Sequence, residues 1–296
     1  MTSETAEKKV SESAAALTTI AVVGAGTMGR GIALCALAAG LSVHLVDLDG
    51  TQLERAASWL RARRETPDGG RTLTATPSLA QGCAGAEVVI EAVVEDLGAK
   101  RSVLAAAEAA APPGAVLATN TSGLPITRIA EGVADPSRVV GMHFFNPVWR
   151  MQLCEIVAGD RTAPEVADTA VAAAERLGRT PVRVADTPGF VASRLNCALG
   201  NEALTLLESG AAGAEDIDTA ARLGLNHPMG PLELLDLVGL DVRLAALETL
   251  EAAFGERFRP RDLHRRLVEE GRLGRKAGRG IYVYDDEGRR AGEAQL

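Results

Sequence analysis

A short apolar run followed by regularly spaced glycines constrains this chain more than any other feature. Residues 20–23 (Ile-Ala-Val-Val) have the composition of a buried parallel strand. Gly24, Gly26 and Gly29 follow with the spacing G-x-G-x-x-G, and residues 31–39 continue as an apolar, Ala-rich helix. In such a turn the first glycine permits a tight bend, the second lets the backbone approach a pyrophosphate, and the third lets the helix pack on the strand. The helix N-terminus would then hold the phosphates.

An acidic residue at the expected offset supports a dinucleotide site. Residues 41–46 predict a second apolar strand, and Asp47 stands at its end, close to the usual offset of about 20 residues. A carboxylate there accepts hydrogen bonds from the ribose hydroxyls and repels a 2′-phosphate, so NAD is favoured over NADP. The alternative is an ordinary βαβ unit with a surface Asp.

Composition bounds the class of protein. The 296 residues suffice for two domains, and 47% hydrophobic with 24% charged residues is ordinary for a soluble protein. A net charge of −8 argues against a nucleic-acid-binding surface, although a local basic patch stays open. No apolar run could span a membrane. Residues 1–17 predict a disordered tail without the features of a secretory or mitochondrial signal, so we expect a cytoplasmic protein.

The cysteines agree with a reducing compartment. They are scattered, with neither a C-x-x-C pair nor the spacing of metal ligands, and we expect them to act as small hydrophobic residues: Cys35, Cys83, Cys154 and Cys197. No metal site is therefore predicted.

Strands and helices alternate through the first two thirds of the chain. Besides the two strands above, apolar strands are expected at residues 87–93, 116–118, 138–144 and 153–157, with a strong helix at 95–111. This order predicts an α/β fold with a doubly wound, mainly parallel sheet of the Rossmann type. Such sheets bind ligands outside the carboxyl ends of their strands, and four polar residues lie at or just past such ends: Asn120, Ser122, His143 and Asn146.

The pattern becomes helical only after residues 186–190 (Asp-Thr-Pro-Gly-Phe). Residues 191–209 predict a long buried helix, and shorter helices are expected around 215–223, 232–237, 242–254 and 261–270. We place the domain boundary at Pro188-Gly189, which gives an NAD-binding domain at 18–187 and a smaller helical domain at 188–296. The apolar face of the long helix leads us to expect a homodimer formed through the second domain.

Four arginines form a basic face on the predicted helix at residues 52–64, which a break at 66–70 ends: Arg55, Arg61, Arg63 and Arg64. This face is either solvated, or it contacts a phosphate of coenzyme A or of a phosphopantetheine arm.

One histidine stands out among four. His143 ends a strand, whereas His44, His227 and His264 fit structural or exposed roles. A free imidazole has a pKa of about 6.5 and exchanges protons near neutral pH. Glu155, an acid within an apolar strand, is the candidate group to orient His143. The alternative is a Glu on an edge strand that faces solvent.

Taken together, these motifs resemble those of the L-3-hydroxyacyl-CoA dehydrogenases over nearly the whole length after the tail. The segments that carry the resemblance are Gly24-Ala25-Gly26-Thr27-Met28-Gly29, Asn120-Thr121-Ser122, residues 143–147 (His-Phe-Phe-Asn-Pro), residues 186–190, residues 227–236 and residues 275–282.

The resemblance implies a role for each matching residue. His143 would remove the 3-hydroxyl proton while hydride passes to the nicotinamide, Glu155 would hold the imidazole, and Ser122 would hydrogen-bond the reacting oxygen. Further cofactor contacts are implied for the glycine-turn residues Gly24, Gly26, Thr27, Met28 and Gly29 and for Asp47, Glu95, Lys100, Asn120, Asn146 and Lys276.

Two departures from the family bear on the substrate. The family has an Asn near substrate and histidine where this chain has Ser193, which reaches less far and cannot donate twice. The helical region after the second strand, residues 52–76, is also shorter than in the short-chain CoA-using members.

We therefore expect an NAD-dependent oxidoreductase that interconverts a 3-hydroxyacyl thioester and its 3-oxoacyl form. The thioester would be carried by coenzyme A or, as in enzymes that make unusual polyketide extender units, by acyl carrier protein. The alternatives are a dehydrogenase of a free 3-hydroxy acid such as a sugar acid, and a dinucleotide-binding protein without turnover.

Overall fold

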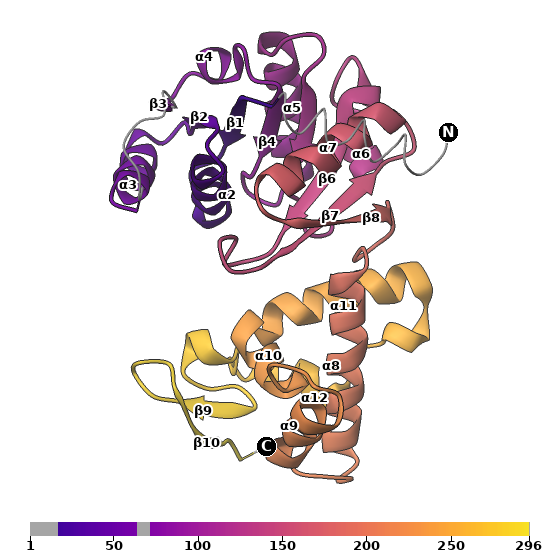
Figure 1. Cartoon of the computed structure of the whole chain (residues 1–296). Coiled ribbons are helices and arrows are strands. Elements are labelled where there is room, and N and C mark those ends of the chain that lie inside the picture. The colour runs from indigo at the N-terminus through magenta and orange to yellow at the C-terminus, as the bar shows by residue number, and fades with distance from the viewer. Residues whose placement is uncertain (1–16, 64–71, 296) are drawn as a thin grey trace. The chain divides into compact units, whose positions relative to one another are not determined.

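The chain divides between Phe190 and Val191 into two compact units in the computed structural model, which describes residues 17–63 and 72–295 (Figure 1). Of the tail expected at 1–17, only Leu17 is described, and it is buried against the core of the first unit. The predicted helix break at 66–70 and Arg64 lie outside the described residues.

An eight-stranded sheet forms the centre of the described first unit, with the strand order β3-β2-β1-β4-β5-β6-β7-β8. All neighbouring strands are parallel except β6 and β7. The predicted mainly parallel α/β architecture is thereby confirmed. The strands are β1 (Thr19–Val23), β2 (Ser42–Val46), β3 (Leu73–Thr76), β4 (Val88–Glu91), β5 (Val116–Thr119), β6 (Val139–Phe144), β7 (Leu153–Ala158) and β8 (Thr180–Ala185).

Helices cover both faces of this sheet (Figure 1). Alternate residues of β1 show why: Ile20 and Val22 join one apolar cluster, and Ala21 and Val23 join the other. On the Ile20 face lie α2 (Thr27–Ala38), α3 (Gly50–Arg61) and α7 (Pro164–Arg176). On the other face lie α4 (Leu79–Cys83), α5 (Leu97–Ala110) and α6 (Ile126–Ala130), and a 3₁₀ turn, Pro136–Arg138, precedes β6.

The sheet changes direction between β6 and β7 because only a short, non-helical connection joins them. A parallel crossover needs a dozen or more residues, whereas residues 145–152 can only return the chain antiparallel. The register pairs His143 with Glu155 and Phe144 with Cys154. β7 also pairs with β8, so Glu155 lies on an internal strand and is 1% exposed, and the alternative of a solvent-facing edge position is wrong.

The described second unit is built mainly from helices around a separate apolar core that contains Leu204, Leu232 and Leu267. Helix α8 is the long helix that the sequence predicts, but it buries one face only, because Leu195 and Leu206 are exposed. The helices are α8 (Ala192–Glu208), α9 (Ala214–Gly224), α10 (Pro231–Val238), α11 (Leu240–Phe254) and α12 (Asp262–Glu269), with 3₁₀ turns at Glu256–Phe258 and Arg275–Ala277.

The expectation that the second domain is helical only is wrong, since β9 (Tyr282–Tyr284) and β10 (Arg290–Glu293) form an antiparallel hairpin. Two buried carboxylates fix this hairpin. Asp236 accepts hydrogen bonds from the Ile281 and Tyr282 amides at 3.0 and 2.8 Å. Asp218 accepts one from the Tyr282 hydroxyl at 2.8 Å and also caps the first turn of α10. Strands this short depend on such partners rather than on a hydrophobic pattern.

Candidate active site

The glycine turn between β1 and α2 is shaped by close contacts of its backbone. Gly24 has φ +105°, and a Cβ added there would lie 2.6 Å from the Ala92 carbonyl oxygen. A Cβ at Gly29 would lie 1.7 Å from the Gly24 carbonyl oxygen, so only glycine lets α2 approach the turn. Gly26 caps α2 with open space around its Cβ position. The turn therefore offers an open helix N-terminus, which fits an anionic group such as a pyrophosphate.

Asp47 faces this turn from the end of β2. One carboxylate oxygen accepts hydrogen bonds from the Ala25 amide and the Gln52 side chain, both at 2.7 Å, and the other accepts one from the Asp49 amide at 2.9 Å. These bonds hold the carboxylate beside the place where an adenosine ribose follows the pyrophosphate in a fold of this type. The sequence does not reveal the role of Gln52, because a single polar residue on a helix usually faces solvent and matches no binding motif.

A pocket of about 230 Å³ opens beside the turn, lined by Ala25, Gly26, Thr27, Arg30, Asp49, Gln52, Arg55 and Ala56. The Nε of Arg30 is buried there without a hydrogen-bond partner among the described residues. An orphaned guanidinium donor next to a helix N-terminus suits a phosphate. Of the basic helix face, Arg55 lines this pocket, whereas Arg63 stacks on the ring of Trp59 with its Cζ 4.2 Å from the ring centroid. The pocket and the turn fit a dinucleotide.

His143 and Glu155 form a buried pair on neighbouring strands. Directly paired residues of an antiparallel ladder project from the same face, so the register of β6 and β7 brings the two side chains together. The His143 Nδ1 atom lies 2.7 Å from Glu155 Oε2, and the side chains are 8% and 1% exposed. A carboxylate at this nitrogen selects the tautomer with hydrogen on Nδ1 and leaves Nε2 for a substrate proton.

Two aromatic rings lie beside this histidine, and an amide side chain binds the backbone of the next residue. The Phe145 and Phe190 ring centroids lie 4.4 and 5.7 Å from the imidazole centroid. Asn120 Oδ1 accepts a hydrogen bond from the Phe144 amide at 2.9 Å and so ties the segment after β5 to the end of β6. Asn146 follows β6 and is exposed. The imidazole is therefore held in a mostly apolar setting at the same sheet edge as the glycine turn.

Ser122 is held by a second acidic residue, Glu95. Glu95 Oε1 accepts hydrogen bonds from Thr121 Oγ1 at 2.6 Å, from the Ser122 amide at 2.9 Å and from Ser122 Oγ at 3.2 Å. Burial raises the pKa of Glu95, but the hydrogen bond from Thr121, the charge of Lys100 and the amide of Ser122 together hold it below its usual value. Glu95 is therefore a carboxylate at neutral pH. Lys100 is fully buried.

Comparisons with known proteins agree with this geometry. The sequence profile for the NAD-binding domain of 3-hydroxyacyl-CoA dehydrogenase matches residues 19–187, and the profile for the C-terminal domain of the same enzyme matches residues 189–284. The chain belongs to the 3-hydroxyacyl-CoA dehydrogenase family. It is an NAD-dependent oxidoreductase.

Relatives of this dehydrogenase match it along nearly its whole length. A probable 3-hydroxybutyryl-CoA dehydrogenase of Bacillus subtilis is 41% identical over 280 residues, which cover 90% of this chain and 98% of the relative. The 3-hydroxyadipyl-CoA dehydrogenase of Escherichia coli is 40% identical over 91% of this chain and 59% of its own. The crystal structure of (S)-3-hydroxybutyryl-CoA dehydrogenase from Ralstonia eutropha superposes with a TM-score of 0.86 at 35% identity and covers 92% of this chain and 100% of that chain.

Two predicted site residues of the dehydrogenase belong to the second unit. Ser193 lies in the first turn of α8. Lys276 lies in a 3₁₀ turn, where its Nζ pairs with Asp241 at 2.5 and 2.7 Å. The other predicted site residues all belong to the first unit.

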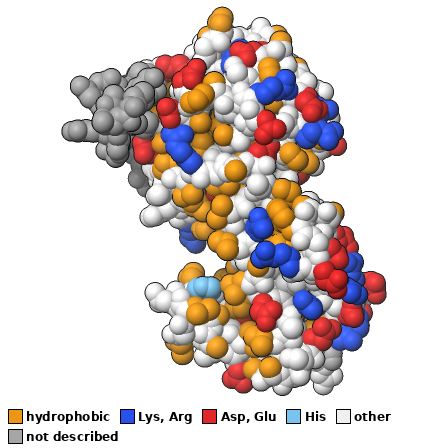
Figure 2. Space-filling model, turned by 90° about the vertical axis from the view of Figure 1, so that its right-hand side faces the viewer, with side chains coloured by type: hydrophobic (Ala, Val, Ile, Leu, Met, Phe, Trp, Pro, Cys, Tyr) orange, Lys and Arg blue, Asp and Glu red, His pale blue; other side chains and the backbone are white. Residues whose placement is uncertain are grey.

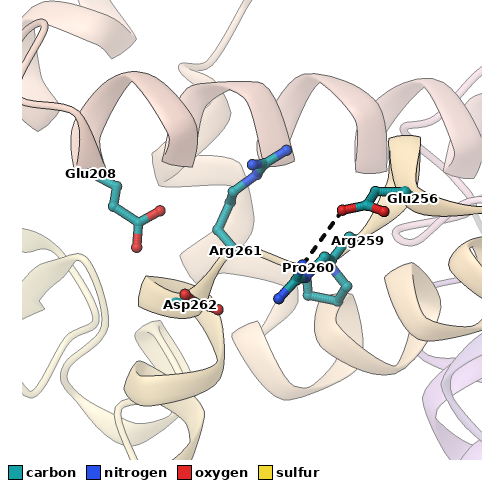
Figure 3. A pocket seen from close by; sticks show the side chains of 6 residues that line it. All are labelled: Glu208, Glu256, Arg259, Pro260, Arg261 and Asp262. Atoms are coloured by element: carbon teal, nitrogen blue, oxygen red, sulfur yellow. Dashed lines mark hydrogen bonds and ion pairs between the residues drawn. The ribbon is translucent and has the colours of Figure 1, made fainter.

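A hollow of about 220 Å³ in the second unit has a structural explanation. Glu208, Glu256, Arg259, Pro260, Arg261 and Asp262 line it, between the end of α8 and the start of α12 (Figure 3). Arg259 pairs with Glu256 at 3.5 Å, and Glu208 accepts a hydrogen bond from the Leu263 amide at 3.0 Å. These contacts tie helix ends together, and we assign the hollow no role in the chemistry.

The described residues contain neither a disulfide-bonded cysteine nor a cluster of side chains that could bind a metal ion. All four cysteines are buried and unpaired, and burial raises the pKa of Cys83 to about 11, which keeps its thiol protonated. Residues 17–63 and 72–295 contain no group of His, Cys, Asp and Glu side chains that could hold a metal ion. No helix in the same ranges is both long and apolar enough to span a bilayer.

Proposed function

We propose that this dehydrogenase interconverts a short-chain 3-hydroxyacyl-CoA and the 3-oxoacyl-CoA, with His143 as its general base and acid. The buried His143–Glu155 pair at the sheet edge that carries the glycine turn is the observation on which the proposal rests. The names of the relatives, which refer to 3-hydroxybutyryl-CoA and 3-hydroxyadipyl-CoA, support a CoA thioester as the substrate.

The residues divide the work as follows. His143 Nε2 takes the proton of the 3-hydroxyl group during oxidation and returns it during reduction, while Glu155 stabilises the imidazolium that forms. Ser122 Oγ donates a hydrogen bond to the reacting oxygen, and Phe145 and Phe190 limit access of water to the imidazole. NAD, when bound at the glycine turn and Asp47, supplies the acceptor for the hydride of the same substrate carbon. We assign the nicotinamide end to Asn120 and Asn146.

The assay that tests this function follows the loss of NADH absorbance with acetoacetyl-CoA, acetoacetyl-acyl carrier protein and free acetoacetate in parallel. We expect turnover of the CoA ester and a loss of ~10²–10⁴-fold in kcat in His143→Gln. The matched control is His44→Gln, since His44 is also a strand histidine and its Nδ1 lies 2.7 Å from the Gly82 carbonyl oxygen, away from Glu155. Turnover confined to the carrier-protein ester would reassign the substrate, and turnover of acetoacetate alone would favour a free hydroxy acid.

We further propose a homodimer formed through the second unit. Large apolar side chains are exposed there, including Leu195, Leu206, Leu223, Leu225 and Val242, and Figure 2 shows apolar side chains at the surface beside clusters of charge. Leu223 is 82% exposed and is the most exposed large apolar side chain among the described residues of this unit. Light scattering of the parent and of Leu223→Glu tests the proposal, and a monomeric parent contradicts it.

The four buried, unpaired cysteines support a reducing compartment such as the cytoplasm.

A further inference from the structure

A buried ion pair lies directly behind the Glu95–Ser122 contact. Glu91 ends β4, and its carboxylate accepts hydrogen bonds from Lys100 Nζ at 2.9 and 3.1 Å, from Thr119 Oγ1 at 2.7 Å and from the Val93 amide at 2.7 Å. Glu91 and Lys100 are both 0% exposed. Replacing a buried ion pair by apolar groups is often neutral or stabilising, so stability of the fold does not by itself explain the pair.

The pair reaches the active site through one further contact. Lys100 Nζ lies 3.3 Å from Glu95 Oε2, on the side of the carboxylate opposite to the oxygen that holds Thr121 and Ser122. The side chain of Glu95 is 42% exposed, whereas Lys100 cannot move toward solvent because it is enclosed. The cation therefore fixes one oxygen of Glu95 while the other orients Ser122.

We infer that Glu91 and Lys100 are positioning residues of the dehydrogenase reaction, which act on the Ser122 hydroxyl through Glu95. This inference rests on the proposed role of Ser122 at the reacting oxygen. Of the three hydrogen bonds to Glu95 Oε1, the one from the Ser122 hydroxyl is the longest. That hydroxyl can turn to a substrate oxygen while the Ser122 amide and Thr121 keep the carboxylate in place.

The charge of Lys100 matters because Glu95 must stay ionised to accept these bonds. The charged groups that face Glu95 are Lys100 from α5 and, behind it, Glu91 from β4, whereas the segment after β5 contributes hydroxyl and amide donors only. The positive charge of Lys100 lowers the pKa of Glu95, so removing this charge raises that pKa. A protonated Glu95 would donate a hydrogen bond and disturb the Ser122 hydroxyl.

The test removes both buried charges together, because Lys100→Met alone leaves two uncompensated carboxylates. We expect Glu91→Gln/Lys100→Met to melt near the parent temperature and to lose about 10-fold in kcat with acetoacetyl-CoA. The acidic limb of its kcat profile should move to higher pH, which a structural pair would not cause. Asp218→Asn, which neutralises an equally buried carboxylate that caps α10, is the control and should lower the melting temperature without moving the limb.

The outcomes separate the inference from the function on which it rests. A parent protein without turnover of any acetoacetyl substrate would overturn the proposed function and this inference with it. If the parent is active and the acidic limb of the kcat profile stays in place in the double variant, the pair has a structural role, whatever the kcat of the variant. A double variant that does not fold would also overturn the inference.

Discussion

Replacing Glu155 by Gln tests the acid–base pair most directly. The substitution keeps the size of the side chain but removes its charge, and the new amide can donate a hydrogen bond to His143 Nδ1. That donation would stabilise the tautomer with hydrogen on Nε2, which cannot accept a substrate proton. Both effects act on the transition state, in which the imidazole becomes an imidazolium.

The size of the loss follows from the geometry. Nδ1 and Oε2 are 2.7 Å apart, and the side chains are 8% and 1% exposed, so solvent screens the pair little. Two unit charges with centres about 4 Å apart attract by about 4 kcal/mol at an effective dielectric constant of about 20. Since each ~1.4 kcal/mol is a factor of ten in rate, we expect kcat to fall about 10³-fold.

Steady-state NADH oxidation with acetoacetyl-CoA measures this loss, together with the Kd of NADH from fluorescence, which should change little. Glu155→Asp keeps the charge and should lose less activity. Glu87→Gln removes a carboxylate that accepts a hydrogen bond from the Thr19 amide at 2.8 Å, at the opposite edge of the sheet, and should behave as the parent. A kcat for Glu155→Gln within about threefold of the parent would refute the assignment of transition-state stabilisation to this carboxylate.

Three further substitutions test other parts of the molecule. Asp47→Ala should weaken NADH binding about 10- to 100-fold and narrow the preference over NADPH, measured by fluorescence titration; an unchanged Kd would remove Asp47 from the cofactor site. Ser193→Asn should raise kcat/KM for acetoacetyl-CoA several-fold if the longer amide restores a substrate contact, whereas a decrease would show that the site is adapted to serine. Burial lowers the pKa of His264 below its usual value, so the unfolded chain binds the extra proton and stability falls as pH drops below about 6.5. The free energy of unfolding in urea should fall less from pH 7 to pH 5 in His264→Gln than in the parent. An equal fall in both proteins would contradict this explanation.

The features that the sequence revealed are those with a local cause. The strand before Gly24, the glycine spacing and Asp47 follow from short-range rules of one βαβ unit. Glu155 could be singled out because a charged residue in an apolar strand needs a partner. The direction of β7 relative to β6 was not predicted, although it explains why Glu155 meets His143.

The missed elements lack a hydrophobic signature. β8 is largely exposed and contains Pro181, so its six residues do not alternate as a half-buried strand does. β9 is held by buried carboxylates of the helical unit and β10 pairs with β9, which is information that only tertiary contacts contain. Glu91 carries the same signal as Glu155, an acid in an apolar strand, and that signal was available but went unused.

The reversal between β6 and β7 also lets evolution change the connection at residues 145–152 independently of the His143–Glu155 pair. Because β6 ends and β7 begins at the same edge of the sheet, both ends of the connection at residues 145–152 are anchored beside the acid–base pair. The pair itself depends on the ladder hydrogen bonds between β6 and β7 and not on the sequence of this connection. Substitutions in the connection beyond Phe145 and Asn146 can therefore change its shape and chemistry while the register that joins His143 to Glu155 is inherited unchanged. A library randomised at the exposed positions Arg150 and Met151 would leave the paired residues of β6 and β7 untouched.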